Sequence, residues 1–423
     1  MKKVLIITYY WPPAGGPGVQ RWLKFVKYLH DFDVDPVLYV PENPHYPIQD
    51  SSFLNEVPEG LKIYRYPIKE PYGLPGLLFP KKTNRISSGI IQTKNQTILE
   101  KSMLWIRGNF FIPDARKSWV RPSVNFLSDI LDKENINTII TTGPPHSVHL
   151  IGNRLKQRHD LTWLADFRDP WTSIGYHQKL RLTKASQRKH EELERMVLQN
   201  ADKIIVTSPT TKKEFEQLTD KPIAVITNGY DSDYEGGANV DSQFTISHIG
   251  SLLTGRNPKN LWKAISDIAR ENEVFRTDLR LEFIGVVAQD VLDTMYRFEL
   301  GPYVKIKGYV SHAEALRRQQ RAQLLLLLEI DSRETQGIIP GKLFEYMAAR
   351  RPILAVGPKK WDAGAIIEET DTGKVFDYAS GDELKEVILS WFKAFKEGTL
   401  HVVSKDIEKY SRRALTKQLV NHL

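Results

Sequence analysis

The stretch GIIPGKLFEYMAARRPILAVG, residues 337–357, joins a loop, an amphipathic helix and a short apolar strand. Pro340 suits the first position of the helix because its missing N–H would have no partner there. Gly341 leaves the free amides of the helix start uncovered, and Lys342 adds a positive charge beside them. The stretch therefore predicts an α/β unit whose helix start binds an anion such as a diphosphate, while Glu345 accepts hydrogen bonds from a vicinal diol such as a ribose. The alternative is a surface ion pair between Lys342 and Glu345.

The same alternation of strand-like and helical segments extends along the whole chain. Strand-like runs lie at residues 4–10, 36–40, 62–67, 137–142, 162–167, 203–208, 223–228, 244–250, 279–285, 304–310, 323–330, 352–357 and 374–378. Most of them are continuously apolar, which is typical of strands covered on both faces by helices. We expect an α/β fold of two Rossmann-like, doubly wound parallel-sheet domains. Ligands of such sheets bind at the carboxyl ends of the strands, so we expect the site between the domains.

A chain of 423 residues predicts more than one domain. The polar, Gly-rich segment YDSDYEGGANVDSQ at residues 230–243 is typical of a linker. We expect an N-terminal domain over residues 1–236 with an irregular insertion at about 41–121. A second domain is expected over residues 237–402, with a final helix in 403–423 that packs back on the first domain.

Composition excludes several classes of site. The chain has no cysteine, which excludes a disulfide framework, a thiolate metal site and a cysteine nucleophile, and suits a reducing cytosol. No HExxH, GxSxG or His/Asp cluster is present, so we expect no metal. The longest apolar run, LLLLLEI from Leu324, is far shorter than the roughly 20 residues of a membrane span. The N-terminal MKKVLIITYYWPPAGG is typical of a buried first strand rather than a signal peptide.

The net charge of +8 is concentrated in one segment. Residues 62–121 hold 12 Lys/Arg and 3 Asp/Glu, which gives that segment +9. Apolar and aromatic residues interleave with the charge, as in SMLWIRGNFF, and this favours a peripheral contact with an anionic membrane. A solvated loop with a few buried anchors is the alternative. We expect no nucleic-acid partner.

Two glycine-rich loops are candidate ligand sites. Gly16 and Gly18 follow the first strand-like run, where bare backbone lets an anion or a sugar approach a helix start. The third glycine of a dinucleotide fingerprint is absent, so a tight turn is the alternative. In the second half, Gly250 and Ser251 follow a strand-like run, and Arg256 is suited to bidentate contact with a phosphate. A solvated loop arginine is the alternative there.

Charged and aromatic residues end two strands of the first half. WLADFRDPW ends a strand-like run with Asp166, Arg168 and Asp169, and such charges are costly in a buried strand unless they are paired or used. We consider them catalytic candidates, with a structural Arg–Asp network as the alternative. His146 in TTGPPHS and Trp171 are candidates for an acceptor-side cleft, although His146 could equally cap a helix or pack.

These motifs resemble the family 4 glycosyltransferases of the GT-B fold over essentially the full length of the chain. The resemblance rests on GGPGVQRWLKF, TNGYD at residues 227–231, GSLLTGRNP, FRDPW and, most specifically, PGKLFEYMAARRPILAVG. It implies transfer of a glycosyl group from a nucleotide-diphospho-sugar with retention of configuration and without a metal. In such enzymes the leaving phosphate can take the acceptor proton, which leaves Asp166 or Arg168 to orient the substrates.

The resemblance also assigns residues at the donor site. Glu345 matches the second glutamate of the family's Glu-x7-Glu motif, which holds the ribose, whereas Gly337 replaces the first. The two diphosphate-binding positions of the glycine loop are Ser251, a second departure, and Arg256. Lys342, in a Pro-x-Lys that some members carry, compensates in phosphate binding.

The expected partners follow from the resemblance. We expect a hexosyltransferase that uses a nucleotide-sugar, UDP-linked rather than GDP-linked, and no further cofactor. The expected acceptor is a glycan or a lipid-linked intermediate of cell-envelope polysaccharide. The expected location is the cytoplasm, with a peripheral contact at the inner face of the membrane. A nucleotide-sugar 2-epimerase-like isomerase and a non-catalytic nucleotide-binding relative are the alternatives.

Overall fold

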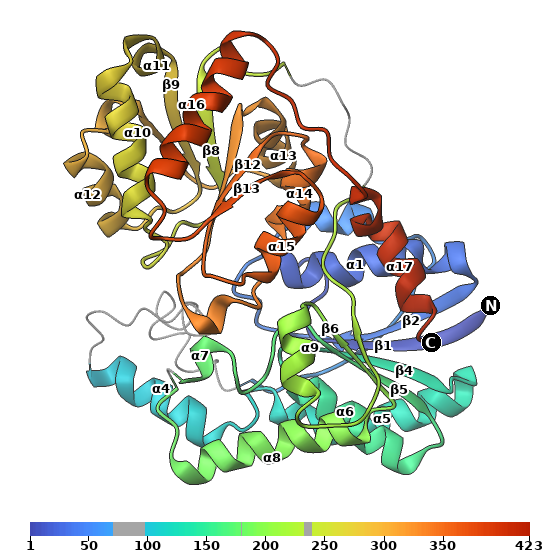
Figure 1. Cartoon of the computed structure of the whole chain (residues 1–423). Helices are drawn as coiled ribbons and strands as arrows, with labels where there is room; N and C mark the ends of the chain where they lie inside the picture. The colour runs from blue at the N-terminus through green and yellow to red at the C-terminus, as the bar shows by residue number, and fades with distance from the viewer. Residues whose placement is uncertain (71–97, 179, 232–238) are drawn as a thin grey trace. The chain divides into compact units, whose positions relative to one another are not determined.

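The structure, a computed structural model, describes residues 1–70, 98–178, 180–231 and 239–423 (Figure 1). It divides into two compact units, Met1–Thr227 with Arg412–Leu423, and Asn228–Ser411. The division after Thr227 falls earlier in the chain than the expected end of the first domain at residue 236. Part of the expected basic insertion, residues 71–97, lies outside the described residues.

The first unit contains a seven-stranded sheet in the order β3-β2-β1-β4-β5-β6-β7. Its strands are β1 (Lys2–Thr8), β2 (Val34–Pro41), β3 (Lys62–Tyr66), β4 (Thr138–Gly143), β5 (Thr162–Phe167), β6 (Lys203–Val206) and β7 (Ile223–Val225). All neighbouring pairs are parallel. In the central strand β1, Leu5 pairs with Val37 of β2 and with Ile139 of β4. The predicted parallel sheet of the first half is confirmed.

Helices cover both faces of this sheet. They are α1 (Pro17–Leu29), α4 (Ile98–Phe110), α5 (Lys117–Glu134), α6 (Ser147–Arg158), α7 (Gly175–Gln178), α8 (Lys184–Asn200), α9 (Pro209–Phe215) and α17 (Arg412–Val420). One apolar cluster contains Trp119 of α5 and Ile151 of α6, and another contains Trp22 of α1 and Leu415 of α17. The last helix, α17, therefore packs against α1 in the first unit, where Arg413 also pairs with Asp31 at 2.9 Å.

The second unit repeats the design with a six-stranded sheet in the order β10-β9-β8-β11-β12-β13. Its strands are β8 (Phe244–Ile249), β9 (Leu279–Ile284), β10 (Val304–Lys307), β11 (Leu324–Leu328), β12 (Ile353–Val356) and β13 (Gly373–Phe376), again all parallel. Its helices are α10 (Lys259–Glu271), α11 (Glu273–Asp278), α12 (Gln289–Arg297), α13 (His312–Arg321), α14 (Lys342–Ala348), α15 (Asp362–Glu369) and α16 (Asp382–Lys396). Each run that was predicted from the sequence overlaps one of the strands.

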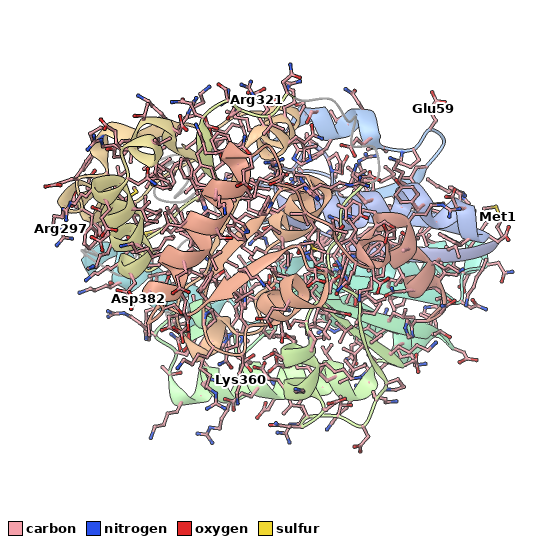
Figure 2. All side chains as sticks on the ribbon, turned by 45° about the horizontal axis from the view of Figure 1, so that its top comes forward. Met1, Glu59, Arg297, Arg321, Lys360 and Asp382 are labelled. Carbon is pink, nitrogen blue, oxygen red and sulfur yellow. The ribbon has the colours of Figure 1, made fainter. Side chains whose placement is uncertain are left out.

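The surface and the core separate by polarity, as the burial of apolar side chains in an α/β unit requires. Charged side chains such as Arg297, Arg321 and Asp382 project outward from the second unit (Figure 2). All five leucines of β11 are buried. Within the described ranges, no helix is both long enough and apolar enough to cross a bilayer.

A carboxylate at the end of α5 ties three parts of the first unit together. Glu134 is only 7% exposed; it accepts hydrogen bonds from Tyr64 Oη at 2.6 Å, from Lys3 Nζ at 3.2 Å and from Lys62. The hydrogen bond from Lys62, followed by that from Tyr64, lowers the pKa of Glu134 to about 2.

The variant Glu134→Gln should therefore be less stable than the unsubstituted chain at pH 7, by about 1.5–3 kcal/mol, the usual range for a hydrogen bond to a charged group. Because the folded-state pKa is depressed, this contribution is present above the unfolded pKa of roughly 4.3 and is lost as the pH falls toward about 2. Urea unfolding of both chains at pH 7 and at low pH measures it. An equal difference at both pH values would contradict this assignment.

Candidate functional site

A glycine turn brings the first strand of the second unit close to Lys342. Gly250 follows β8 with a φ of 109°, in the region that favours glycine, and a Cβ there would lie 3.2 Å from Lys342 Nζ. Ser251, the next residue, is exposed. The predicted loop residues Gly250 and Ser251 thus lie beside the predicted lysine at the carboxyl end of β8.

Lys342 is held by the end of the same strand. Its Nζ donates to the Ile249 carbonyl at 3.0 Å and lies 3.2 Å from His248 Nε2. His248 Nδ1 lies 2.9 Å from the Leu326 carbonyl, which assigns the proton to Nδ1 and leaves Nε2 to accept from the lysine. Burial, and then the charge of Arg256, lower the pKa of Lys342 to about 7. The charge of this ammonium is therefore sensitive to an anion bound beside it.

Arg256 is paired within the unit. Its Nε and Nη2 donate to the two carboxylate oxygens of Glu329 at 3.1 and 3.0 Å. Glu329 directly follows β11 and is 0% exposed, whereas the side chain of Arg256 is 24% exposed. The bidentate edge that we expected to face a phosphate is thus occupied by Glu329. Only the remaining edge of the guanidinium is open to a ligand.

The helix that carries Glu345 presents an open start. Gly341 is the N-cap of α14, and a Cβ there would have no atom within 4 Å. Glu345 is partly buried; its Oε2 accepts from Gln319 Nε2 at 2.9 Å, and its Oε1 lies 3.9 Å from His312 Nε2. The carboxylate is thus oriented by α13, while the neighbouring lysine side chain points to the end of β8.

In the first unit, Asp166 lies in the core. It is 0% exposed and accepts hydrogen bonds from Arg21 Nη2 at 2.9 Å, Trp22 Nε1 at 2.7 Å and Thr142 Oγ1 at 2.8 Å. Burial opposes ionisation, but Arg21 and the hydrogen bonds outweigh it and lower the pKa of Asp166. The structural Arg–Asp alternative describes this geometry, with Arg21 as the partner. Asp166 can influence a substrate only through the residues that it holds.

Arg168 binds backbone rather than a carboxylate. Its Nη1 donates to the Gly18 carbonyl at 2.7 Å, its Nε to the Gly143 carbonyl at 3.2 Å, and its Nη2 to the Pro144 carbonyl. A Cβ at Gly18 would lie 2.3 Å from Arg168 Nη1, so any larger residue there would displace this arginine. Gly16 has a φ of 96°, and a Cβ there would meet no atom within 4 Å, so the backbone at this position stays open.

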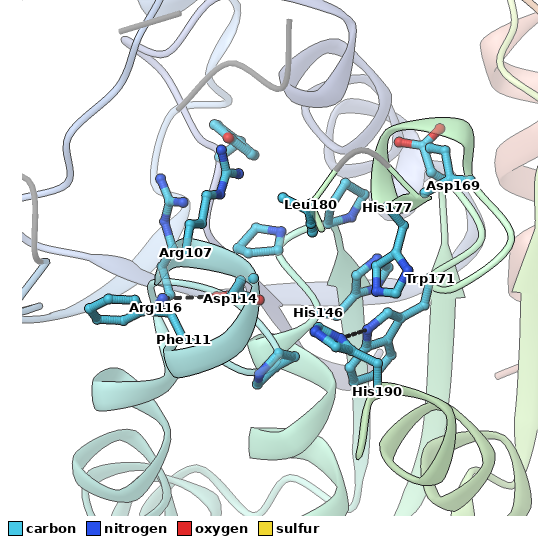
Figure 3. Close-up of a pocket in the computed structure, with 16 residues that line it drawn as sticks. Arg107, Phe111, Asp114, Arg116, His146, Asp169, Trp171, His177, Leu180 and His190 are labelled. Carbon is cyan, nitrogen blue, oxygen red and sulfur yellow. Dashed lines mark hydrogen bonds between the residues drawn. The ribbon is translucent and has the colours of Figure 1, made fainter. Parts of the chain in front are cut away.

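Asp169 is the exposed member of the three charges and lines a cavity of about 300 Å³ (Figure 3). His146 and Trp171 line the same cavity. Their rings stack with centroids 4.7 Å apart and an interplanar angle of 3°. The structure thus brings the two predicted acceptor-side residues together, and Asp169 with them, while Asp166 and Arg168 are directed elsewhere.

Several residues of these sites were not predicted. His177 and His190 line the cavity of the first unit, and Glu329 holds Arg256 in the second. Glu329 could have been found, because it is the acid that directly follows five leucines at the end of a strand. His190 shares the buried face of α8 with Glu194 and Val197, a spacing that a helical wheel reveals. Among the described residues, no group of three or more His, Asp or Glu side chains could hold a metal ion.

Two α/β units, each built on an all-parallel sheet flanked by helices, are the architecture of the GT-B class of fold. Three solved structures share the fold over nearly the whole chain. Sucrose-phosphate synthase from Thermosynechococcus elongatus is 13% identical, with a TM-score of 0.58 over 100% of this chain and 98% of that one. Staphylococcus aureus TarM, in complex with Fondaparinux, alpha-GlcNAc-glycerol and UDP, is 11% identical, with a TM-score of 0.58 over 100% and 99%.

The third is a provisionally assigned UDP-N-acetylglucosamine 2-epimerase from Listeria monocytogenes, 12% identical, with a TM-score of 0.53 over 99% of this chain and 95% of that one. At these identities the similarity shows the fold. It does not separate a transferase from an epimerase.

The family model of glycosyltransferase family 4 matches residues 95–234. This match confirms the predicted resemblance to family 4 within these residues, which contain FRDPW and TNGYD, and it supports a family 4 type of glycosyltransferase and sugar transfer in general. No match is found among curated proteins.

The role of Asp166 can be tested by its effect on stability. Asp166→Ala should lower the free energy of unfolding by about 3–5 kcal/mol, because it leaves the buried Arg21 charge uncompensated. The double variant Arg21→Met, Asp166→Leu should recover part of this loss, since both charges are removed together. Urea denaturation measures both. A fully stable Asp166→Ala variant that has lost sugar transfer would instead favour the catalytic role.

Proposed function

We propose that this chain transfers a glycosyl group, with retention, from a nucleotide-diphospho-sugar to an acceptor hydroxyl. The observation that carries the proposal is the gathering of Gly250, Arg256, Lys342 and Glu345 at the strand ends of the second unit. Lys342 contacts the end of β8, and the charge of Arg256 lowers its pKa. Glu345 lies one helical turn after Lys342. Two cations with a carboxylate one helical turn further on suit a diphosphate next to a ribose.

The same groups account for the chemistry. The bond between the sugar C1 and the diphosphate oxygen breaks, and the acceptor oxygen bonds to C1 on the same face. The acceptor proton passes to the leaving phosphate. Negative charge builds on the nucleoside diphosphate, and Lys342 and the open edge of Arg256 stabilise it. Since these two cationic side chains balance the negative charge of the leaving group, we propose transfer that needs no divalent metal and no further cofactor.

We assign the roles of the charged residues of the first unit from the solvent exposure of their side chains. Asp169 is the exposed carboxylate of the first unit and can contact an acceptor hydroxyl, whereas Asp166 and Arg168 hold the loops in position. Gly16 offers bare backbone to the donor. We propose a UDP-sugar donor, which the UDP in the names of two similar structures supports.

Titration with UDP-sugars tests the donor site. Binding of an anion favours the charged form of Lys342, whose pKa in the free chain is about 7. The affinity should therefore fall as the pH rises above 7, approaching tenfold per pH unit while the lysine loses its proton. A nucleotide-diphospho-sugar has no terminal phosphate, so the ligand itself does not titrate there. Calorimetry at pH 6.5 and 8.5 measures the change.

Two variants serve as matched controls for this titration. Lys342→Met should weaken binding at pH 6.5 and abolish the pH dependence. Glu345→Ala should weaken binding by about 1–3 kcal/mol at pH 6.5, because it removes a hydrogen-bond acceptor, and should keep a pH dependence, because Lys342 still titrates. Equal affinity of all three chains at every pH would contradict the proposed site.

The fold shared with the Listeria protein is the reason to keep a 2-epimerase-like isomerase as the alternative. Incubation of the donor without an acceptor separates the two activities, since an epimerase produces a new nucleotide-sugar and a transferase produces at most slow hydrolysis. Gly337, in place of the first motif glutamate, is the reason to keep a non-catalytic relative as a further alternative. Donor binding without turnover on any acceptor would support it.

For the acceptor, we propose a lipid-linked or cell-envelope glycan reached by a peripheral contact with the inner face of the cytoplasmic membrane. Three apolar side chains of α4 are exposed, Trp105 by 41%, Ile106 by 46% and Phe110 by 60%. Lys101 and Arg181 flank Trp105 and Ile106 along one groove. Apolar side chains interleaved with cations suit the interface of an anionic bilayer.

Vesicle flotation tests this contact. The chain should float with phosphatidylglycerol vesicles at low salt, and less at high salt. Trp105→Ser should weaken the affinity for the vesicles by about tenfold or more, since burying one large apolar side chain contributes about 1.5–3 kcal/mol. Tyr309→Ser, which removes an aromatic side chain that is 82% exposed in the second unit, is the matched control and should float normally. Equal flotation of both variants would refute the role of α4.

A further inference from the structure

A buried glutamine of α13 holds the carboxylate of Glu345 from inside the protein. The helices α13 and α14 pack against each other (Figure 1). All ten residues of α13 are described, and Gln319 alone among them is buried, with 0% exposure. Its Nε2 donates to Glu345 Oε2 at 2.9 Å. Because an ionised carboxylate only accepts hydrogen bonds, this contact assigns the amide nitrogen of Gln319, and not its oxygen, to the side that faces Glu345.

Apolar residues flank Gln319 on its face of the helix. Ala315 lies one turn before it and Ala322 follows at the end of the helix, and both pack in the apolar cluster that contains Leu343 of α14. A buried amide costs free energy unless it is hydrogen-bonded, whereas a leucine of similar size would pack there without a polar partner. Packing alone therefore does not account for a glutamine at this position, and the hydrogen bond to Glu345 does.

A second residue of α13 limits the carboxylate on its other side. His312 lies seven positions before Gln319, which is two helical turns along the same face. Its Nε2 is 3.9 Å from Glu345 Oε1, beyond the distance of a hydrogen bond. An ionised carboxylate has about four acceptor positions. One hydrogen bond from Gln319 therefore fixes the plane of the group without using up its capacity to accept from a ligand.

We infer that Gln319 is a positioning residue for the donor site. It orients Glu345 so that this carboxylate accepts hydrogen bonds from both vicinal hydroxyls of a ribose, and the site thereby selects a ribonucleotide over a 2′-deoxyribonucleotide. Because Gln319 is buried, it acts through Glu345 and does not touch the nucleotide. The inference rests on the proposed function, in which Glu345 holds the ribose of the donor.

The size of the selectivity follows from the hydrogen bonds to the carboxylate. A 2′-deoxyribonucleotide lacks one of the two hydroxyls, so it loses one charge-assisted hydrogen bond and should bind about 10–100-fold more weakly. Without Gln319 the carboxylate of Glu345 can rotate, and two well-oriented hydrogen bonds are replaced by a mixture of poorer ones. We therefore expect the loss of Gln319 to lower the ratio of the two affinities, while the contacts to the diphosphate are kept.

Binding of matched nucleotides to the full chain tests the inference. The probes are UDP, ADP and GDP, each paired with its 2′-deoxy counterpart, and calorimetry at pH 6.5 measures the ratio of the two dissociation constants for each pair that binds. Gln319→Leu, which keeps the size of the side chain and removes the donor, should lower this ratio by about 3–10-fold. Gln319→Asn keeps an amide but is one methylene too short to reach Glu345. It should lower the ratio as well, and it serves if the leucine variant does not fold.

Two further variants separate a positioning role from a general loss of structure. Gln323→Leu is the matched control, because Gln323 is also a buried glutamine of this unit, at 6% exposure, but donates to the Asp241 carbonyl at 2.7 Å. It should leave the ratio unchanged even where it lowers stability. In Glu345→Ala the ratio should already be close to one, and adding Gln319→Leu should not change it further, since the two residues act as one unit.

The outcomes distinguish this inference from the proposed function. A ratio that Gln319→Leu and Gln319→Asn both retain in full, or a fall of equal size in Gln323→Leu, would overturn the role of Gln319 and leave the donor site as proposed. A ratio close to one in the unsubstituted chain, or binding of none of the nucleotides, would overturn the ribose role of Glu345 itself and the inference with it.

Discussion

The buried ion pair between Arg21 and Asp166 fixes the strand ends of the first unit. Arg21 is 1% exposed and Asp166 is 0% exposed, so each charge depends on the other for compensation. The same guanidinium donates to the carbonyls of Ile226 and Thr227 at 2.9 and 2.8 Å, at the end of this part of the unit. The side chain of Arg21 therefore fixes the positions of α1, β5 and the segment Ile226–Thr227 relative to one another. The loops that Arg168 holds take their positions from this frame.

The second unit uses an acid and an arginine in a comparable place, with a different outcome. Glu329 at the end of β11 holds Arg256 from the loop after β8, but this arginine keeps part of its surface in solvent. A fully buried pair such as that of Arg21 positions the backbone and offers nothing to a ligand. A pair whose arginine is partly exposed fixes that arginine and leaves a cationic edge, beside a lysine whose own charge is poorly solvated. This difference explains why an anion site is expected in the second unit and not at the matching acid of the first.

Sequence patterns predicted the strands because a continuously apolar run in an α/β chain is best buried as a strand of a parallel sheet that helices cover on both faces. They also predicted that Gly250, Lys342 and Glu345 share a strand-end site, since the carboxyl ends of parallel strands meet at one edge. The patterns could not predict which side chains pair with one another in the folded chain. Arg21 and Asp166 are 145 positions apart, and only the packing of α1 on the sheet brings them together. The same limit hid Glu329 as the partner of Arg256, and it hid the cavity that brings the histidines of α7 and α8 together.

Helix α4 links the two features of the first unit that the donor site does not explain. Its exposed side carries Trp105 and Phe110, while Arg107 and Gly108 line the cavity. Glycine is required at 108, because a Cβ there would lie 2.6 Å from Leu182 Cδ2 and 2.9 Å from the Leu180 carbonyl. The close approach of residues 180–182 to the helix thus closes the cavity on one side. The proposed lipid-linked acceptor would use both sides of this helix, with its lipid at the apolar outer face and its sugar in the cavity.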